Sequence, residues 1–356
     1  MDTLKLARTL ASIPSHEDET AAGDALESWL EEHTDAAVTR DDAGNVIARR
    51  GRGERTLALV GHHDVVPPAP AQTAGGEYVL EERDGRLYGR GTADMKGPLA
   101  AAAVAFRDAD PSGELVFASF VGEEVGGVGA RHAVDTGFAP DAAVVVEGST
   151  GYSAPGVTDV AIAHKGRRGS TITASGTAAH ASEPGAGENA IYRALEAVEI
   201  LRDIEAPTVE VADAPLSGSV TVTGIDGGSA MNVVPETCEI TVDERTVPGE
   251  TAPLERVEAV PGVSWAIDQA VPPMRCDDEA FVAAVLEAAR AAQPNHPEGV
   301  VKPHATDAGW LAEAGTSCVI CGAAEPGEAH TADESVSIAV LERCEEIYRR
   351  VAEEWP

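Results

Sequence analysis

Lysine is scarce in this chain. Only Lys5, Lys96, Lys165 and Lys302 are present among 356 residues, so arginine supplies most of the 26 basic side chains. Sixty acidic residues leave a formal net charge of −34, and aromatic residues make up only 4% of the chain. This charge argues against nucleic acid and anionic membranes as partners. The composition predicts a protein of a high-salt cytoplasm, because the Debye length of about 3 Å at 1 M salt screens self-repulsion.

Long apolar runs and a dense cysteine framework are also lacking. No apolar run of about 18 residues and no N-terminal hydrophobic leader is present, so we expect neither a membrane span nor a signal peptide. Five cysteines, an odd number, fit a reducing compartment, and we expect a cytoplasmic location. Cys318 and Cys321 form a C-x-x-C pattern inside an apolar run. We interpret them as buried strand residues rather than as a redox or zinc site.

Strand and helix patterns alternate along the first part of the chain. A helix capped by Ser15 is predicted to run through Leu30. Strands are expected at 56–60, 114–121 and 142–146, and helices at about 97–108 and 127–135. The pattern resumes later with a helix at 278–292, a strand at 317–321 and a helix at 334–353. This alternation predicts an α/β fold with a mostly parallel central sheet.

A different pattern interrupts this series from about residue 168. The expected order is a strand at 170–174, a helix at 189–204, strands at 218–223 and 237–243, a short helix at 251–259 and a strand at 263–267. That βαββαβ order is ferredoxin-like. We therefore predict a discontinuous catalytic domain, 1–167 and 271–356, with a smaller inserted domain, 168–270.

The segment Gly61-His62-His63-Asp64 directly follows an apolar run, 57–60. Side chains alternate along an extended backbone, so His62 and Asp64 point the same way. A histidine that binds a metal needs an acceptor on its second ring nitrogen, usually a carboxylate. The pair therefore predicts one metal ligand and its support, with His63 only a neighbour of the pocket.

Further ligand-type residues lie just past other strand patterns. Glu123 and Glu124 follow the strand at 114–121, Glu147 follows the strand at 142–146, and His330 lies in a loop after the strand at 317–321. Asp94 is the centre of a glycine-punctuated loop before a helix. Sites in open α/β sheets form outside the carboxyl ends of strands, so we expect these side chains to meet.

Two histidines with several carboxylates suit zinc. Two metals need a bridging ligand, and together they polarise a carbonyl and activate water. One free carboxylate must then act as general base. Adjacent side chains diverge, so either Glu123 or Glu124 can bind metal while the other stays free.

The segments 61–67, 89–97 and 123–126 together resemble a family of co-catalytic zinc amidohydrolases. This family includes acetylornithine deacetylase, succinyl-diaminopimelate desuccinylase and aminoacylase, and the resemblance covers nearly the whole chain. It implies a zinc-peptidase-like catalytic domain with an inserted lid or dimerisation domain. It also implies two Zn²⁺ ions, replaceable by Co²⁺ or Mn²⁺. The implied ligands are His62, Asp94 and Glu147 for one ion and Asp94, Glu124 and His330 for the other. Asp94 would bridge, Asp64 would orient His62, and Glu123 would be the general base.

The resemblance extends to the inserted domain. His180 matches a lid histidine that helps to stabilise the oxyanion, often across a dimer interface. Asn232 and Arg245 match positions that would contact the substrate's carboxylate; for Arg245, structural pairing with nearby acids is the alternative. Arg167 lies in a Gly-Arg-Arg-Gly segment that resembles a desuccinylase sequence. His304 departs from the family pattern, and is either a specificity residue or a residue before a helix.

The reaction predicted from these residues is hydrolysis of an N-acyl amino acid in amino-acid biosynthesis. N-succinyl-diaminopimelate is the first candidate substrate and N-acetylornithine the second, which correspond to lysine and arginine biosynthesis. A dipeptidase or carboxypeptidase of the same family is the nearest alternative. A non-catalytic metal-binding or amino-acid-binding protein is a further one, although such a protein would not need Glu123. The partners expected are a small N-acyl amino acid and a second copy of the chain.

Overall fold

The computed structural model describes residues 3–212 and 214–355, which form two compact units. Unit 1 contains the described residues of Met1–His164 and Met274–Pro356, and unit 2 is Lys165–Pro273. None of the described helices is both long and apolar enough to cross a membrane.

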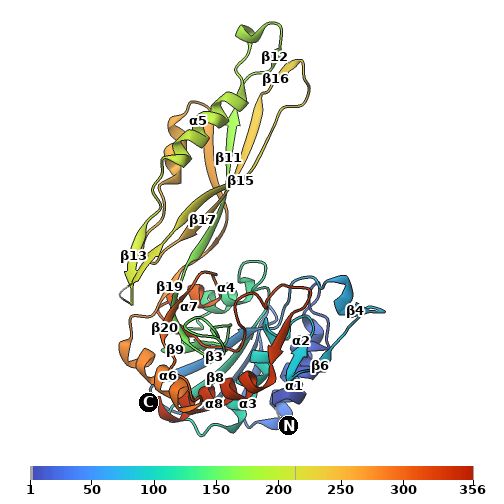
Figure 1. The fold of residues 1–356 in the computed structure, drawn as a ribbon, viewed down its shortest axis with the longest axis vertical. Helices are drawn as coiled ribbons and strands as arrows, with labels where there is room; N and C mark the ends of the chain where they lie inside the picture. Colours follow the sequence, from blue (N-terminus) through green and yellow to red (C-terminus); the bar gives the residue numbers. More distant parts are fainter. Residues whose placement is uncertain (1–2, 213, 356) are drawn as a thin grey trace. The chain divides into compact units, whose positions relative to one another are not determined.

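Unit 1 is built on a nine-stranded sheet within the described residues (Figure 1). Its strands, in spatial order, are β1 (Ala37–Arg40), β2 (Val46–Gly51), β8 (Glu114–Phe120), β3 (Thr56–His62), β9 (Ala142–Val145), β21 (Ser317–Ile320), β10 (Val160–His164) and β19 (Met274–Arg275), with β20 (Gly299–Lys302) also paired to β10. The central strands β8, β3, β9 and β21 are parallel, whereas the pairs β1–β2, β2–β8, β10–β21 and β10–β19 are antiparallel. The expected α/β fold with parallel strands at its centre is confirmed.

Helices cover both faces of this sheet because its central strands are apolar on both sides. One face carries α1 (Thr3–Ala11), α2 (Thr20–His33), α3 (Lys96–Asp108), α6 (Glu279–Ala291) and α8 (Ile338–Glu354). The other face carries α4 (Val128–Asp135) and α7 (Ala308–Glu313). Alternate residues divide between the two cores, with Leu57 and Leu59 in one and Ala58 and Val60 in the other.

The register of the parallel strands places their carboxyl ends together. His62 of β3 lies opposite Phe120 of β8, and Val60 lies opposite Val145 of β9. The residues that follow β8 and β9 therefore leave the sheet beside His62. This alignment is what gathers the candidate site.

Shorter elements complete unit 1. They are η1 (Pro70–Gln72), the pair β4 (Thr73–Ala74) and β5 (Glu77–Tyr78), and a three-stranded sheet of β6 (Glu81–Arg83), β7 (Arg86–Tyr88) and β22 (Ser335–Ser337). The helix predicted over 334–353 starts later, at Ile338, because residues 335–337 pair with β7. The cap prediction for Ser15 is wrong, since its hydroxyl donates to the carbonyl of His63 and α2 begins at Thr20.

Unit 2 contains a four-stranded antiparallel sheet in the order β15 (Ser219–Gly227), β17 (Thr237–Thr246), β11 (Gly166–Ser175) and β18 (Val263–Val271). Helix α5 (Ala190–Arg202) packs on this sheet, together with the 3-10 helix η3 (Leu254–Ala259). The remaining elements are β12 (Ala179–His180) paired with β16 (Val233–Val234), β13 (Thr208–Val211) paired with β14 (Ala214–Ser217), and η2 (Pro184–Ala186). The main elements follow the βαββαβ order, with η3 as the second helix.

Candidate metal centre

His62 is the buried centre of the first group of donor atoms. Its Nε2 lies 3.2 Å from Asp94 Oδ1 and 3.4 Å from Glu147 Oε1. Its Nδ1 lies 3.1 Å from Asp64 Oδ1, so the pair predicted at the end of this strand does share one side of the backbone. Burial opposes the charged imidazole, but the surrounding carboxylates raise the pKa of His62 well above its ordinary value.

Asp94 stands between the two histidines. Its Oδ1 faces His62, and its Oδ2 lies 3.1 Å from Nε2 of His330. Although Asp94 is buried, the two imidazoles lower the pKa of its carboxyl. One carboxylate whose two oxygens face two imidazoles has the geometry that a bridging ligand requires.

The second group is completed by Glu124, whose Oε1 lies 2.9 Å from His330 Nε2. His330 itself is 51% exposed, and its backbone adopts the left-handed conformation with φ of 62°. This conformation is uncommon outside glycine, and it occurs here in a loop residue that turns its imidazole toward two carboxylates.

Both groups fit divalent metal ions. In each triad, His62 with Asp94 and Glu147, and Asp94 with Glu124 and His330, one ligand atom per residue lies within 4.8 Å of the others. Imidazole nitrogens and carboxylate oxygens are donors that zinc accepts, and the shared Asp94 would bring two ions close together.

Asp64 also positions the loop that contains Glu123 and Glu124. Its two carboxylate oxygens accept hydrogen bonds from the backbone N–H groups of these residues, at 3.2 and 3.0 Å. Glu124 turns to His330, whereas the Glu123 carboxyl is not part of either triad. Burial, together with neighbouring acids, raises the pKa of Glu123 well above its usual range.

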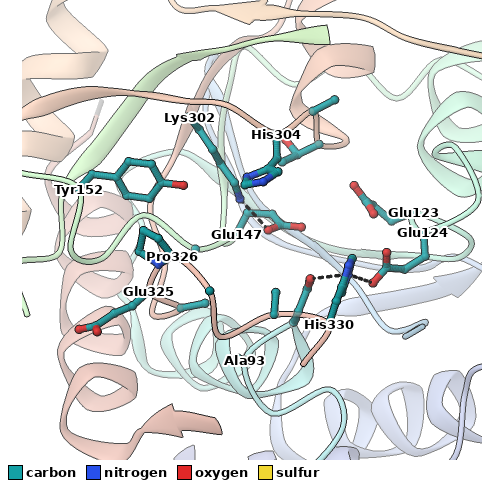
Figure 2. Close-up of a pocket in the computed structure, with 17 residues that line it drawn as sticks. Ala93, Glu123, Glu124, Glu147, Tyr152, Lys302, His304, Glu325, Pro326 and His330 are labelled. Atoms are coloured by element: carbon teal, nitrogen blue, oxygen red, sulfur yellow. Dashed lines mark hydrogen bonds and ion pairs between the residues drawn. The ribbon is translucent and has the colours of Figure 1, made fainter. Parts of the chain in front are cut away.

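A cavity of about 290 Å³ opens beside these groups in unit 1. Figure 2 shows Glu123 and Glu124 on one side of it, and Tyr152 and Pro326 on the other. His304 also lines the cavity, and α7 begins four residues later, so the alternative of a residue leading directly into a helix is not favoured. The Nδ1 of His63 lies 2.7 Å from the hydroxyl of Ser119, and its place as a neighbour of the pocket stays a prediction.

Lys302 is a residue of this site that the sequence did not point to. Its Nζ donates to Glu147 Oε2 at 2.9 Å, which leaves Oε1 facing His62. The sequence offered one indirect signal, which is that lysine occurs only four times in the chain. In the structure, Lys302 ends strand β20, which runs parallel to β10.

The site residues predicted in the inserted domain, His180, Asn232 and Arg245, lie in unit 2, and so does Arg167, which falls just outside the predicted bounds of that domain. The Nδ1 of His180 lies 2.6 Å from the hydroxyl of Ser182. Arg167 and Arg245 both donate to the carboxylate of Asp243, through Nε at 3.0 and 2.8 Å, so the alternative of structural pairing describes the observed contacts of Arg245. Asn232 accepts a backbone hydrogen bond from Ala181 through its carbonyl.

Comparison with known proteins identifies the family. The sequence pattern of peptidase family M20/M25/M40 matches residues 58–354. The chain belongs to this family. It is accordingly a hydrolase of amide bonds from a metallopeptidase family, as the sequence predicted. The acetylornithine deacetylase of Myxococcus xanthus is 32% identical over 334 residues, which is 87% of this chain and 84% of that protein.

Solved structures share the fold. The aminopeptidase PepT of Bacillus cereus superposes with a TM-score of 0.77 at 19% identity, covering 99% of this chain and 97% of that one. The YXEP protein of Bacillus subtilis, described as a dinuclear metal-binding peptidase of the M20 family, superposes with a TM-score of 0.71 at 16% identity, covering 98% and 96%. These identities are low, so the likeness concerns the architecture of both units rather than the substrate.

Proposed function

We propose that this protein hydrolyses the amide bond of N-acyl amino acids with the help of two zinc ions. The observation that carries the proposal is a pair of donor triads that share Asp94, beside a cavity lined by the unshared carboxylate of Glu123. A protein that only stored metal or bound an amino acid would have no use for that additional carboxylate next to the shared centre.

The proposed ligands divide as the two triads do. His62, Asp94 and Glu147 would hold one ion, and Asp94, Glu124 and His330 the other. When bound, two such ions polarise a carbonyl group and acidify water near neutral pH. Asp64 keeps His62 oriented through its Nδ1, and Lys302 keeps one oxygen of Glu147 turned away from His62.

Glu123 is the proposed general base. Its carboxylate would take a proton from the attacking water and transfer it to the leaving nitrogen, so that an acid and a free amine are released. The backbone N–H of Glu123 donates a hydrogen bond to Asp64, which fixes the backbone from which the side chain extends beside the cavity. Removing a general base typically costs about 10²–10⁴-fold in rate. Glu123→Gln should therefore lose turnover on this scale while keeping both metals.

We assign substrate roles in unit 2 to His180, Asn232, Arg245 and Arg167. His180 would stabilise the oxyanion, a contribution of about 3–4 kcal/mol per donor in other enzymes. Asn232 and Arg245 would contact the substrate's carboxylate, for which a planar guanidinium is suited. Asp243, which both arginines contact, would orient them for this task.

Acetylornithine is one of two substrates that we put forward, and the similarity to the Myxococcus xanthus deacetylase supports it. The other is N-succinyl-diaminopimelate, which the Gly-Arg-Arg-Gly segment at 166–169 supports. These choices would place the enzyme in arginine or lysine biosynthesis. A dipeptidase or carboxypeptidase remains the alternative, because it needs the same metal centre and the matched family is one of peptidases.

A hydrolysis screen at molar salt tests the proposal. Zinc-loaded protein is offered acetylornithine, succinyl-diaminopimelate, other acetyl-amino acids and dipeptides, and amine release is measured. Hydrolysis of an acyl-amino acid that Glu123→Gln cannot perform is the expected result. Hydrolysis of dipeptides alone would establish the peptidase alternative. If Glu123→Gln kept full turnover, or a chelator left turnover unchanged, the mechanism would be wrong.

We also propose a homodimer formed through unit 2. Strand β15 is an edge of its sheet, and apolar side chains are exposed on β15 and on α5, namely Ile225, Tyr192 and Leu195. Unpaired edges and exposed apolar groups favour association. Sedimentation of the wild type and of Tyr192→Glu tests this, with a dimer that the variant dissociates as the expected result.

The proposed compartment is a high-salt cytoplasm. The net charge of −34 supports it, as do the five cysteines, all of which are buried as free thiols. Screening of self-repulsion predicts that the melting temperature rises as the salt concentration is raised from 0.1 M toward 1 M, where the Debye length falls from about 10 to about 3 Å. A melting temperature that did not change with KCl would contradict this proposal.

A further inference from the structure

A buried carboxylate outside both triads connects the loops that carry Asp94 and His330. Glu334 lies four residues after His330 and is buried. Its Oε1 accepts hydrogen bonds from two consecutive backbone N–H groups, those of Ala93 at 3.0 Å and of Asp94 at 3.1 Å. The backbone carbonyl of Glu334 accepts a further hydrogen bond from the N–H of Gly89 at 3.0 Å.

Arg90 fixes the other side of this carboxylate. Its Nη1 donates to Glu334 Oε2 at 2.5 Å, and its Nη2 donates to the carbonyl of Pro67 at 3.3 Å. The side chain of Arg90 is 3% exposed and that of Glu334 is fully buried. Since Pro67 lies five residues after His62, the pair joins the three loops that follow His62, surround Asp94 and contain His330.

Stability alone is a poor reason for such a pair. Moving two charges out of water costs several kcal/mol per ion, and apolar residues of similar volume often serve stability as well or better. What apolar residues cannot do is accept hydrogen bonds from the backbone of Asp94. Partners that orient metal ligands in this way typically contribute about 10–100-fold to metal affinity.

We propose that Glu334 is a positioning residue that sets the spacing between Asp94 and His330, and that Arg90 holds it in place. This inference rests on the proposed metal centre. It extends that centre to a carboxylate that binds no ion itself. Because Glu334 and His330 share one short loop, moving the carboxylate moves the backbone that presents the imidazole as well as that of Asp94.

Two double variants separate positioning from folding. Arg90→Met with Glu334→Gln, and Arg90→Met with Glu334→Leu, both remove the buried charges, but only the first keeps an oxygen that can accept from the N–H groups of Ala93 and Asp94. Metal-free protein is titrated with Zn²⁺ by calorimetry, and amide hydrogen exchange at Asp94 is followed before metal is added. We expect the leucine variant to bind Zn²⁺ about 10–100-fold more weakly and to exchange this amide faster, whereas the glutamine variant stays close to the wild type.

A matched control comes from a neighbouring pair of the same kind. Arg86 of β7 contacts Glu328, which lies two residues before His330, so this pair also joins strand β7 to the His330 loop. The Glu328 carboxylate accepts from the N–H of Glu325 rather than from Asp94. The double variant Arg86→Met with Glu328→Leu should therefore leave both Zn²⁺ affinity and exchange at Asp94 unchanged.

Glu334→Asp provides a test that does not depend on the double variants folding. It keeps the charge opposite Arg90 but withdraws the carboxylate by one methylene group, so weaker Zn²⁺ binding is expected here too. The inference is overturned if Glu334→Asp and the leucine variant at position 334 bind Zn²⁺ like the wild type, or if the glutamine and leucine variants at that position lose affinity equally. It is also overturned if Arg86→Met with Glu328→Leu loses as much Zn²⁺ affinity as Arg90→Met with Glu334→Leu. Wild-type protein that bound no Zn²⁺ would instead defeat the proposed centre itself.

Discussion

The two donor triads share Asp94 but lie in different surroundings. His62, at the end of a central strand, is 1% exposed, whereas His330, on a loop, is 51% exposed. The sheet itself places His62 beside the residues that follow β8 and β9, because neighbouring strands end in register. His330 does not lie at a strand end. Its loop is connected to Asp94 by the hydrogen bond that the Asp94 N–H donates to the Glu334 carboxylate. A ligand on a loop thus needs its own connections, which a ligand at a strand end receives from the fold.

The largest effect should come from the residue that the two triads have in common. Asp94→Asn removes the negative charge that faces both histidines while keeping the size of the side chain. We expect loss of both metals and of detectable hydrolysis, measured by metal analysis and a turnover assay. Asp333, an exposed residue three positions after His330, offers the control Asp333→Asn, which should retain both metals and hydrolysis. Retention of one tightly bound ion by Asp94→Asn would show that the triads do not depend on a shared ligand.

Removal of metal by a chelator should produce the second-largest effect, because the two triads differ in exposure. A chelator reaches an ion at the exposed His330 more readily than one at the buried His62. We expect a first phase that removes one ion per chain together with the activity, and a slower phase that removes the second. Metal content and turnover are measured in the same samples over time. The variant His330→Ala should contain one ion from the start and lack the first phase. A single phase that released both ions together would contradict the difference in accessibility.

The sequence also predicts the ligands at strand ends differently from the ligands on loops. His62, Glu123, Glu124 and Glu147 were found from residues alone, because each lies just past an apolar strand pattern and parallel strands end together. Asp94 and His330 were singled out as loop residues, but only the family resemblance divided all these residues into two ligand sets and chose Glu123 as the base.

Other contacts leave no local pattern at all. Lys302 meets Glu147 across 155 positions, and Glu334 meets Asp94 across 240, so neither contact follows from periodicity or from a motif. The fold was easier to predict from the sequence than these contacts, since amphipathic and apolar periods are local properties. Its errors occurred where tertiary contacts decide the outcome: Ser15 bonds to His63 instead of capping a helix, and residues 335–337 pair with β7 instead of starting one.

Stability without metal should also separate the two histidines. His62→Ala leaves the buried carboxylate of Asp64 without its imidazole partner, which costs about 1–3 kcal/mol for a buried group. His330→Ala also removes an imidazole that contacts two carboxylates, those of Asp94 and Glu124, but this side chain is half-exposed, so water can take its place and we expect a smaller loss of stability than for His62→Ala. Denaturant unfolding of metal-free protein at fixed high salt measures both values. Equal destabilisation by the two substitutions would mean that the loop contributes as much to the fold as the strand end does.

Salt should produce the smallest difference between the triads. Acidic residues across the surface of a chain with a net charge of −34 attract cations, and this attraction is screened as the Debye length falls from about 10 Å at 0.1 M salt to about 3 Å at 1 M. Screening acts on exposed charges far more than on buried ones, so raising the salt should weaken Zn²⁺ binding at the His330 triad and change the His62 triad little. Two-site calorimetric titrations at both salt concentrations measure this, with His330→Ala reporting the buried triad alone. If that variant showed the same salt dependence as the exposed site of the wild type, burial would not shield the ion at His62. The two triads would then differ only in the contacts that position their ligands.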